Sequence, residues 1–209
     1  MVWLSKILER LGRLSICPIP QNGVTVAPAL IRAGGLGVGE IGMPKTDGRP
    51  DYKRAVAEAR RLLDEFGFEE PPINPVRIAR ELGTDVCFVG LPQEHQNVSG
   101  FYDTTDNTIF VNEEEFPKRQ TFTVAHELGH KVLHSEWAAS ENYKVLLRDS
   151  SLQSKDPIEQ EANAFAAHLL VPRSMLLSYR KVATIEELSE LFAVSMPVVR
   201  NRLKFELGE

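Results

Sequence analysis

The order of its sequence patterns predicts an α+β fold for this 209-residue chain. Two helical patterns come first, at residues 51–66 and 74–82, and three short strand-like runs follow them. Two longer helical patterns occupy 117–134 and 156–170, and further helical signals lie within 173–209. We therefore expect N-terminal helices, a small antiparallel sheet, a helix laid against that sheet, and a C-terminal helical segment.

The first fifty residues differ in composition from the rest of the chain, because they hold eight of the fourteen glycines and five prolines. Residues 1–16 could form a short amphipathic helix, and residues 17–50 indicate an irregular linker. The G-x-G-x-x-G pattern at 37–42 follows no strand and opens no helix, so it does not predict a dinucleotide site. We expect a flexible N-terminal extension, a domain at 51–172, and a helical pair within 173–209 that packs on it.

The first two helices have clear ends in the sequence. Asp51 can cap the first helix and Gly67 can end it. Asn74 followed by proline begins the second helix, and Gly83 ends it. Each helix carries apolar residues at helical spacing, and these form the expected core face: Ala55, Val56, Ala59, Leu62, Leu63 and Phe66 in the first, and Val76, Ile78, Ala79 and Leu82 in the second.

Three runs with the composition of strands lie at 85–89, 98–102 and 108–112. Residues 103–107, between the last two runs, are typical of a hairpin loop. The helix predicted at 117–134 follows directly, and we expect it to pack on the sheet.

That helix carries the most specific motif of the chain, His126-Glu127-Leu128-Gly129-His130. Two histidines four positions apart lie on one helix face, one turn from each other. Their nitrogens can meet on one zinc ion, while Glu127 stands close enough to take a proton from a water on the metal. The motif predicts a zinc peptidase with His126 and His130 as metal ligands and Glu127 as the catalytic base.

A catalytic zinc site usually has a third protein ligand and an open position. The longer metzincin pattern is excluded because position 136, where it requires a histidine, holds Glu136. His134 lies one further turn along the helix, but three successive turns of a straight helix cannot surround one ion. We expect His134 to end the helix or to donate a hydrogen bond to a ligand.

The third ligand is expected in the helix that Asp156 and the following proline begin. Glu159 lies near the edge of that helix's apolar face, whereas Glu161 lies farther round, closer to solvent. We prefer Glu159 because a metal ligand must point inward, and Glu161 is the alternative. Asn163, one turn after Glu159, could hydrogen-bond a ligating histidine. The apolar face comprises Ala162, Phe165, Ala166, Leu169 and Leu170.

Composition excludes several other classes of protein. A net charge of −5 argues against a nucleic-acid coat or a membrane-surface binder. Cys17 and Cys87 form no C-x-x-C pair, so zinc held by thiolates is not expected. Basic residues interrupt the apolar positions of residues 1–19, which therefore predict neither a signal peptide nor a membrane span. A cytoplasmic location is the expectation.

Two motifs together carry a resemblance to a known family. Phe122-Thr123-Val124-Ala125 precedes H-E-L-G-H, and residues 159–172 read E-x-E-A-N-x-F-A-A-x-L-L-x-P. These runs resemble the ImmA/IrrE family of metallo-endopeptidases, over about residues 52–205. The resemblance implies a zincin-like fold with a gluzincin-like site, in which His126, His130 and Glu159 hold Zn²⁺ and Glu127 is the base.

The resemblance also implies a function. Members of this family are typically cytoplasmic bacterial or phage regulators that cleave or inactivate a helix-turn-helix repressor. They thereby release mobile-element, stress-response or DNA-damage genes, and some are paired with the repressor in the manner of a toxin–antitoxin system. We therefore expect a zinc endopeptidase whose protein substrate is a helix-turn-helix transcriptional repressor.

Some points stay open at the level of sequence. An extra donor to the oxyanion of the transition state could be Tyr102, His134, Tyr143 or His168. Residues 184–206 have the outline of a helix-turn-helix, but 184–209 hold three basic residues against five acidic ones, so DNA binding is not the role we expect for them. A zinc-containing protein that binds a repressor without cutting it is the other alternative, and loss of Glu127 would leave such binding intact.

Overall fold

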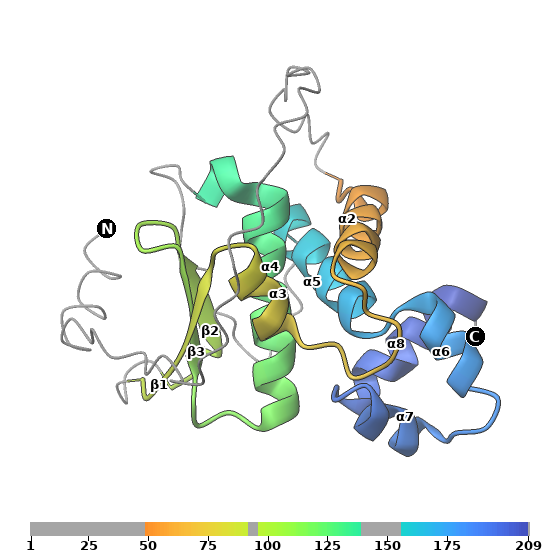
Figure 1. Cartoon of the computed structure of the whole chain (residues 1–209). Helices are drawn as coiled ribbons and strands as arrows, with labels where there is room; N and C mark the ends of the chain where they lie inside the picture. The colour runs from red at the N-terminus through yellow and green to blue at the C-terminus, as the bar shows by residue number, and fades with distance from the viewer. Residues whose placement is uncertain (1–48, 92–95, 139–155, 209) are drawn as a thin grey trace. The chain divides into compact units, whose positions relative to one another are not determined.

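The computed structural model describes residues 49–91, 96–138 and 156–208, which form helices α2 to α8 and strands β1 to β3 (Figure 1). These residues belong to one compact unit, residues 48–209. In this part of the chain, two helices precede three strands and five helices follow them, which confirms the α+β class. The helix and linker expected before residue 49 lie outside the described residues.

The first two helices begin where their caps predict. Helix α2 (Tyr52–Glu65) follows Asp51, whose carboxylate accepts a hydrogen bond of 3.0 Å from the backbone N–H three residues on. Helix α3 (Pro75–Glu81) follows Asn74, whose side chain accepts the corresponding bond at 3.1 Å. Such bonds satisfy backbone donors that have no partner within the helix. The glycine after each helix has a positive φ, which stops the helix without the strain another residue would meet.

The sheet consists of β1 (Asp85–Val89), β2 (Gly100–Asp103) and β3 (Thr108–Asn112), in the spatial order β1-β3-β2. The loop between β2 and β3 makes the predicted hairpin, and these two strands pair antiparallel. Strand β1, however, pairs with β3 in the parallel direction. The sheet is therefore mixed, and the expectation of a wholly antiparallel sheet was wrong for β1.

The cause of this difference lies in which strand of the hairpin occupies the centre. Strand β3 carries Ile109, Phe110 and Val111 in a row, whereas its hairpin partner β2 begins with Gly100 and ends with Asp103. A central strand is covered by neighbours on both edges, so the more apolar strand gains most from that place. Because β3 runs in the same direction as β1, docking the hairpin through β3 makes the new pair parallel. A strand pattern read along the chain contains no information on this choice.

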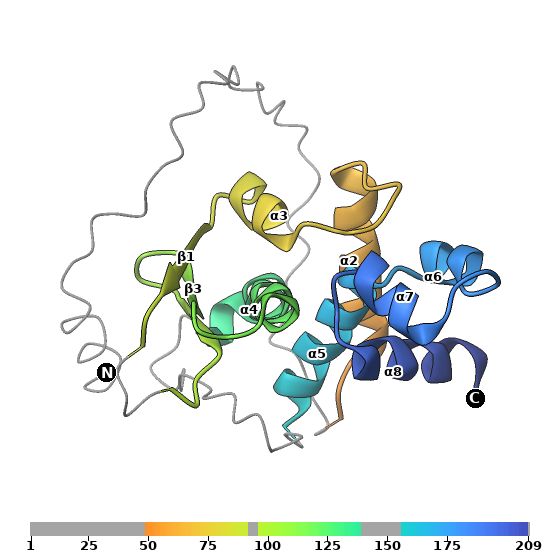
Figure 2. The same cartoon turned by 90° about the horizontal axis from the view of Figure 1, so that it is seen from below.

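Helix α4 (Pro117–Ala138) lies between the sheet and helix α5 (Pro157–Leu170), as both views show (Figures 1 and 2). The two helices lie close together at Gly129. A Cβ atom added there would lie 3.0 Å from the Phe165 ring and 3.2 Å from the Cα of Ala162. The absence of a side chain at this position therefore permits the close approach of α4 and α5.

Three short helices complete the chain: α6 (Arg173–Tyr179), α7 (Ile185–Leu191) and α8 (Met196–Leu207). The sequence patterns predicted α7 and α8 but not α6. The apolar residues of α7, of α8 and of the turn between them belong to the same core cluster as those of α2, α4 and α5. Within the described ranges no helix has the length and apolar character needed to cross a bilayer.

Candidate metal centre

The structure brings His126, His130 and Glu159 together between α4 and α5. The Nε2 atoms of the two histidines are 3.0 Å apart. Carboxylate oxygens of Glu159 lie 3.3 Å from the Nε2 of His126 and 3.1 Å from that of His130. Ligands about 2.0–2.1 Å from a tetrahedral zinc are separated from one another by about 3.3 Å. The three side chains thus form a ligand triangle whose size suits one zinc ion.

All three side chains of the ligand triangle are nearly inaccessible to solvent. His126, His130 and Glu159 are 1%, 2% and 6% exposed. Burial would raise the pKa of Glu159, but hydrogen bonds from the two imidazoles outweigh burial and hold that pKa below its usual range. An ionised carboxylate beside two imidazole nitrogens is a donor set that could hold a metal ion.

Glu127 follows His126 on α4 and is 4% exposed. A step of one residue turns the helix by about 100°, so Glu127 projects beside the histidine face and not along it. A carboxylate withdrawn from water next to the ligand triangle has the placement that proton transfer at a metal site requires. The structure therefore brings the three predicted ligands together and buries Glu127 next to His126 on the same helix.

Glu161 does not lie where the sequence analysis placed it. It is 2% exposed, so the expectation that it points closer to solvent was wrong. Its carboxylate accepts a hydrogen bond of 2.8 Å from the backbone N–H of Asp51 and lies 3.6 Å from the Nε2 of His134. Helix α5 is covered by α4 on one side and by α2 on another, so it has two buried faces. The sequence analysis assumed one buried face, as in a surface helix.

His134 marks a break in the active helix. Its φ of −131° and ψ of 29° are not helical, although the helix continues to Ala138. The guanidinium of Arg54 on α2 donates a hydrogen bond of 2.7 Å to the carbonyl of Leu133, next to the break. Burial lowers the pKa of His134 to about 4, so the ring is neutral near pH 7. Its ring also makes a hydrogen bond to the backbone of Ile158, the residue before Glu159.

Two other candidates for stabilising an oxyanion point elsewhere. The hydroxyl of Tyr102 donates to Asn107 at 2.8 Å, within a network that ties the hairpin loop to α3 and α4. His168 is nine residues after Glu159 on α5, about 13 Å along the helix axis, and it contacts Arg202 at 3.0 Å. Tyr143 lies outside the described residues. Of the three candidates within the described residues, only His134 is near the ligand triangle, with its ring centroid 6.0 Å from that of His130.

The sequence analysis missed the part that α2 plays at this site. Arg54 holds the broken end of α4, and Asp51 binds Glu161, although neither belongs to a metal-binding motif. The only sequence signal was the helix cap at Asp51, which carried no indication of a long-range contact. Asn163 is half-buried one turn after Glu159, and its hydrogen bond to a ligating histidine stays a prediction.

Comparisons with known proteins agree with this geometry. The family described as "Peptidase_M78: IrrE N-terminal-like domain" matches residues 79–204. "Uncharacterized immunity region protein 2" of Bacillus phage phi105 is 28% identical over 149 residues, which cover 70% of this chain and 87% of the phage protein. A Mycobacterium tuberculosis transcriptional regulator has a similar fold, with a TM-score of 0.54 at 21% identity over 73% of this chain. The chain spans only 46% of that regulator's length.

Proposed function

The chain belongs to the IrrE N-terminal-like (Peptidase_M78) family, and on this premise we propose that it is a zinc-dependent endopeptidase. The observation that carries the proposal is the ligand triangle of His126, His130 and Glu159 with the buried Glu127 beside it. Three protein ligands leave one position of a tetrahedral zinc free for water or substrate, which distinguishes catalytic sites from closed structural ones.

Each residue has a defined part in the proposed reaction. A zinc ion held by His126, His130 and Glu159 would lower the pKa of a water molecule at the site to about 7 and would polarise a carbonyl oxygen. Glu127 accepts the proton of the water as it attacks the peptide carbonyl, and then donates that proton to the leaving amine. The Glu159 carboxylate, whose pKa is held low, remains ionised and keeps both histidine nitrogens oriented inward.

We infer a protein substrate, namely a helix-turn-helix transcriptional repressor. Support comes from the ImmA/IrrE-like motifs and from the phage relative, whose name assigns that protein to an immunity region. Cleavage of a repressor would make this chain a cytoplasmic regulatory protease in stress, mobile-element or toxin–antitoxin control. Direct DNA binding has little support. Arg202, one of three basic residues in 184–209, is 2% exposed and paired with Glu206 at 2.6 Å.

One experiment separates cleavage from binding. Wild type and Glu127→Gln are purified without chelators, their zinc content is measured, and each is incubated with any helix-turn-helix repressor found encoded beside this chain. We expect about one zinc per chain in both proteins and cleavage by wild type alone, because the variant keeps the ligands and loses the base. Equal loss of repressor activity without a cut would favour the non-cleaving partner. Absence of stoichiometric zinc from both proteins would exclude the metal site itself.

A further inference from the structure

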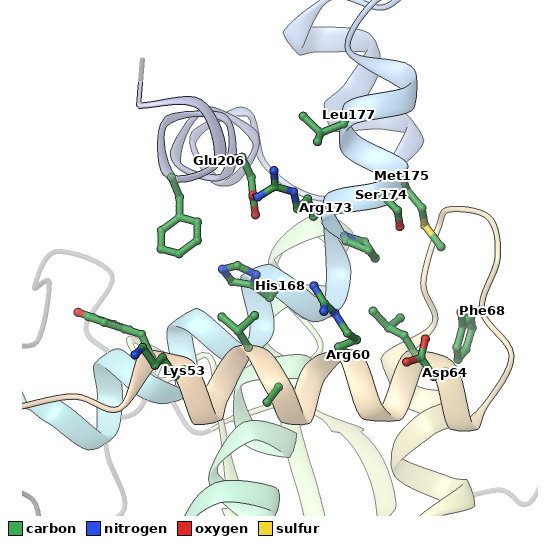
Figure 3. A pocket seen from close by; sticks show the side chains of 16 residues that line it. Lys53, Arg60, Asp64, Phe68, His168, Arg173, Ser174, Met175, Leu177 and Glu206 are labelled. Atoms are coloured by element: carbon green, nitrogen blue, oxygen red, sulfur yellow. The ribbon is translucent and has the colours of Figure 1, made fainter.

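A second hollow lies away from the ligand triangle, between α2, the end of α5, α6 and α8 (Figure 3). Its volume is about 710 Å³, and none of His126, His130 and Glu159 lines it. Hollows of this size are typical of sites that bind ligands or side chains of a partner. We call it the α2–α8 groove.

The α2–α8 groove has an apolar lining and two aromatic residues at its rim. Val56 and Ala57 of α2, Phe68, and Met175 and Leu177 of α6 supply apolar surface. At the rim, Tyr52 is 43% exposed and Phe205 is 62% exposed. Exposed aromatic side chains around an apolar depression are the usual anchors of protein interfaces.

The charges around the groove leave two cations without partners. Lys53 and Arg60 lie two helical turns apart on α2 and form no ion pair with any described residue. Figure 3 shows Arg60 reaching from α2 into the groove, towards His168. Across the groove, Glu206 is already paired with Arg173 at 2.7 Å and with Arg202 at 2.6 Å.

The other ionisable groups of the wall do not neutralise these cations. Burial and the nearby Arg202 lower the pKa of His168 to about 4, so this ring adds no charge near pH 7. Asp64, one turn beyond Arg60, is the only lining carboxylate without an ion pair among the described residues. The stretch from Lys53 to Arg60 is therefore locally positive in a chain whose net charge is −5.

We propose that the α2–α8 groove docks an acidic amphipathic helix of a partner protein. An apolar helix face fits the lining, as in other helix-in-groove interfaces. Carboxylates seven positions apart on that helix are separated by about 10.5 Å, the same spacing as Lys53 and Arg60 on α2. Opposite charges at matching positions set the register of such a complex and exclude basic helices.

The rim residue Tyr52 also contacts helix α5. Its hydroxyl donates a hydrogen bond of 2.6 Å to Gln160, so this end of the groove lies against the first turn of α5. Docking itself needs no hydrolysis, so it can be measured in Glu127→Gln and fails or succeeds independently of the proposed peptidase activity.

The test uses a display library of helical peptides about four turns long, selected on full-length Glu127→Gln protein loaded with zinc. We expect the selected peptides to share an apolar face and acidic residues seven positions apart. Binding of the best peptide should weaken about tenfold or more in Arg60→Glu and in Phe205→Ala, because one removes the charge match and the other an anchor. Arg61→Glu is the matched control, since Arg61 is on the same helix but pairs with Glu58 and Glu65 outside the groove.

The proposal is overturned if the selected peptides are not enriched in acidic residues. It is also overturned if the best peptide binds Arg60→Glu as tightly as it binds the wild-type protein. Sedimentation of the same proteins tests a second copy of this chain as the occupant. Self-association that Arg60→Glu abolishes and Arg61→Glu preserves would replace the partner helix with a dimer contact. Thermal unfolding of each variant checks that the exposed substitutions leave the fold intact.

Discussion

Glu159 and Glu161 are two positions apart on α5, are both buried, and have different surroundings. Glu159 faces the imidazoles of His126 and His130, whereas Glu161 faces the start of α2 and His134. Two buried carboxylates on one helix require two packed faces, each with its own donors. This geometry favours Glu159 as the metal ligand. Glu161 instead links α5 to the start of α2 through Asp51 and lies beside His134 of α4.

The first prediction separates these two roles. Glu159→Gln should weaken zinc binding by about a hundredfold or more, because a neutral amide replaces an anionic ligand. Glu161→Gln should weaken it by about tenfold or less, since the amide oxygen can still accept the hydrogen bond from Asp51. Competition titration with a chromophoric zinc chelator measures both affinities. The reverse order of the two effects would make Glu161 the third ligand.

The lowered pKa of His168 predicts that the unfolding free energy depends on pH. Burial, Arg202 and Arg60 lower its pKa to about 4, although Glu206 opposes them. The folded state therefore favours the neutral ring, and this contribution is complete above about pH 6.5 and is lost as the pH falls towards 4. We expect protonation of His168 to lower the unfolding free energy by about 2 kcal/mol between neutral pH and pH 5.

Urea denaturation of wild type and His168→Gln at pH 7.5 and pH 5 measures this effect. The decrease in unfolding free energy between the two pH values should be about 2 kcal/mol smaller in the variant, because glutamine does not titrate there. His134 has a lowered pKa as well and remains in both proteins, so the difference between them isolates His168. The same decrease in both proteins would show that His168 is not held neutral.

At the scale of elements, the candidate site depends on how closely α4 and α5 approach. Gly129 lies between the two histidines of the motif and faces Phe165 and Ala162 of α5. Helix α2 holds the last turns of α4 and the first turns of α5. Arg54 binds the carbonyl of Leu133 at the break in α4, and the backbone of Asp51 binds Glu161. Helix α2 lies before residues 79–204, the segment that the family pattern matches, and still supplies two of the contacts that hold α4 and α5.

Gly129→Ala tests the close approach. Alanine favours an isolated helix by about 1 kcal/mol over glycine. In this place, however, its Cβ would lie 3.0 Å from Phe165 and 3.2 Å from the Ala162 backbone, so α5 must shift. We expect a net loss of about 1–3 kcal/mol in unfolding free energy and weaker zinc binding, because Glu159 moves away with α5. Denaturant unfolding and zinc titration check both, and a more stable variant with unchanged affinity would contradict the predicted contact.

At the scale of the whole molecule, the ligand triangle joins two helices that are about thirty residues apart in sequence and close in space. A metal ion bound there would connect the sheet-side half of the core to the α2–α5 half. An ion that binds only the folded state stabilises it by mass action. The C-terminal helices share the same core cluster, so this stabilisation extends to the whole folded unit.

Removal of metal should therefore lower the melting temperature of the entire chain. With free zinc at about a thousand times its dissociation constant, binding contributes about 4 kcal/mol. For a protein of this size that corresponds to a shift of roughly 10 °C. Differential scanning calorimetry with zinc and with a chelator measures the shift. Glu159→Gln is the control, and its shift should fall to about a third of the wild-type shift, because a hundredfold weaker site leaves free zinc at only about ten times its dissociation constant.

The sequence by itself determined the features that depend on local chemistry. The caps at Asp51 and Asn74, the hairpin before β3, and the histidine spacing of the motif all follow from interactions within a few residues. The inward direction of Glu159 also follows from local geometry, because a rotation of about 100° per residue places it beside the apolar face of α5. These inferences succeeded because hydrogen bonds and side-chain directions over short separations depend little on the rest of the fold.

Only the tertiary structure decided which faces are covered and which strands meet. The parallel pairing of β1 with β3, the burial of Glu161 beneath α2, and the capture of the Leu133 carbonyl by Arg54 all join segments far apart in the chain. The burial of Arg202, which a helix-turn-helix outline would have left exposed, belongs with them. Each depends on how elements pack around one core, and that packing is set by the combined apolar surface of all of them and by no single local pattern.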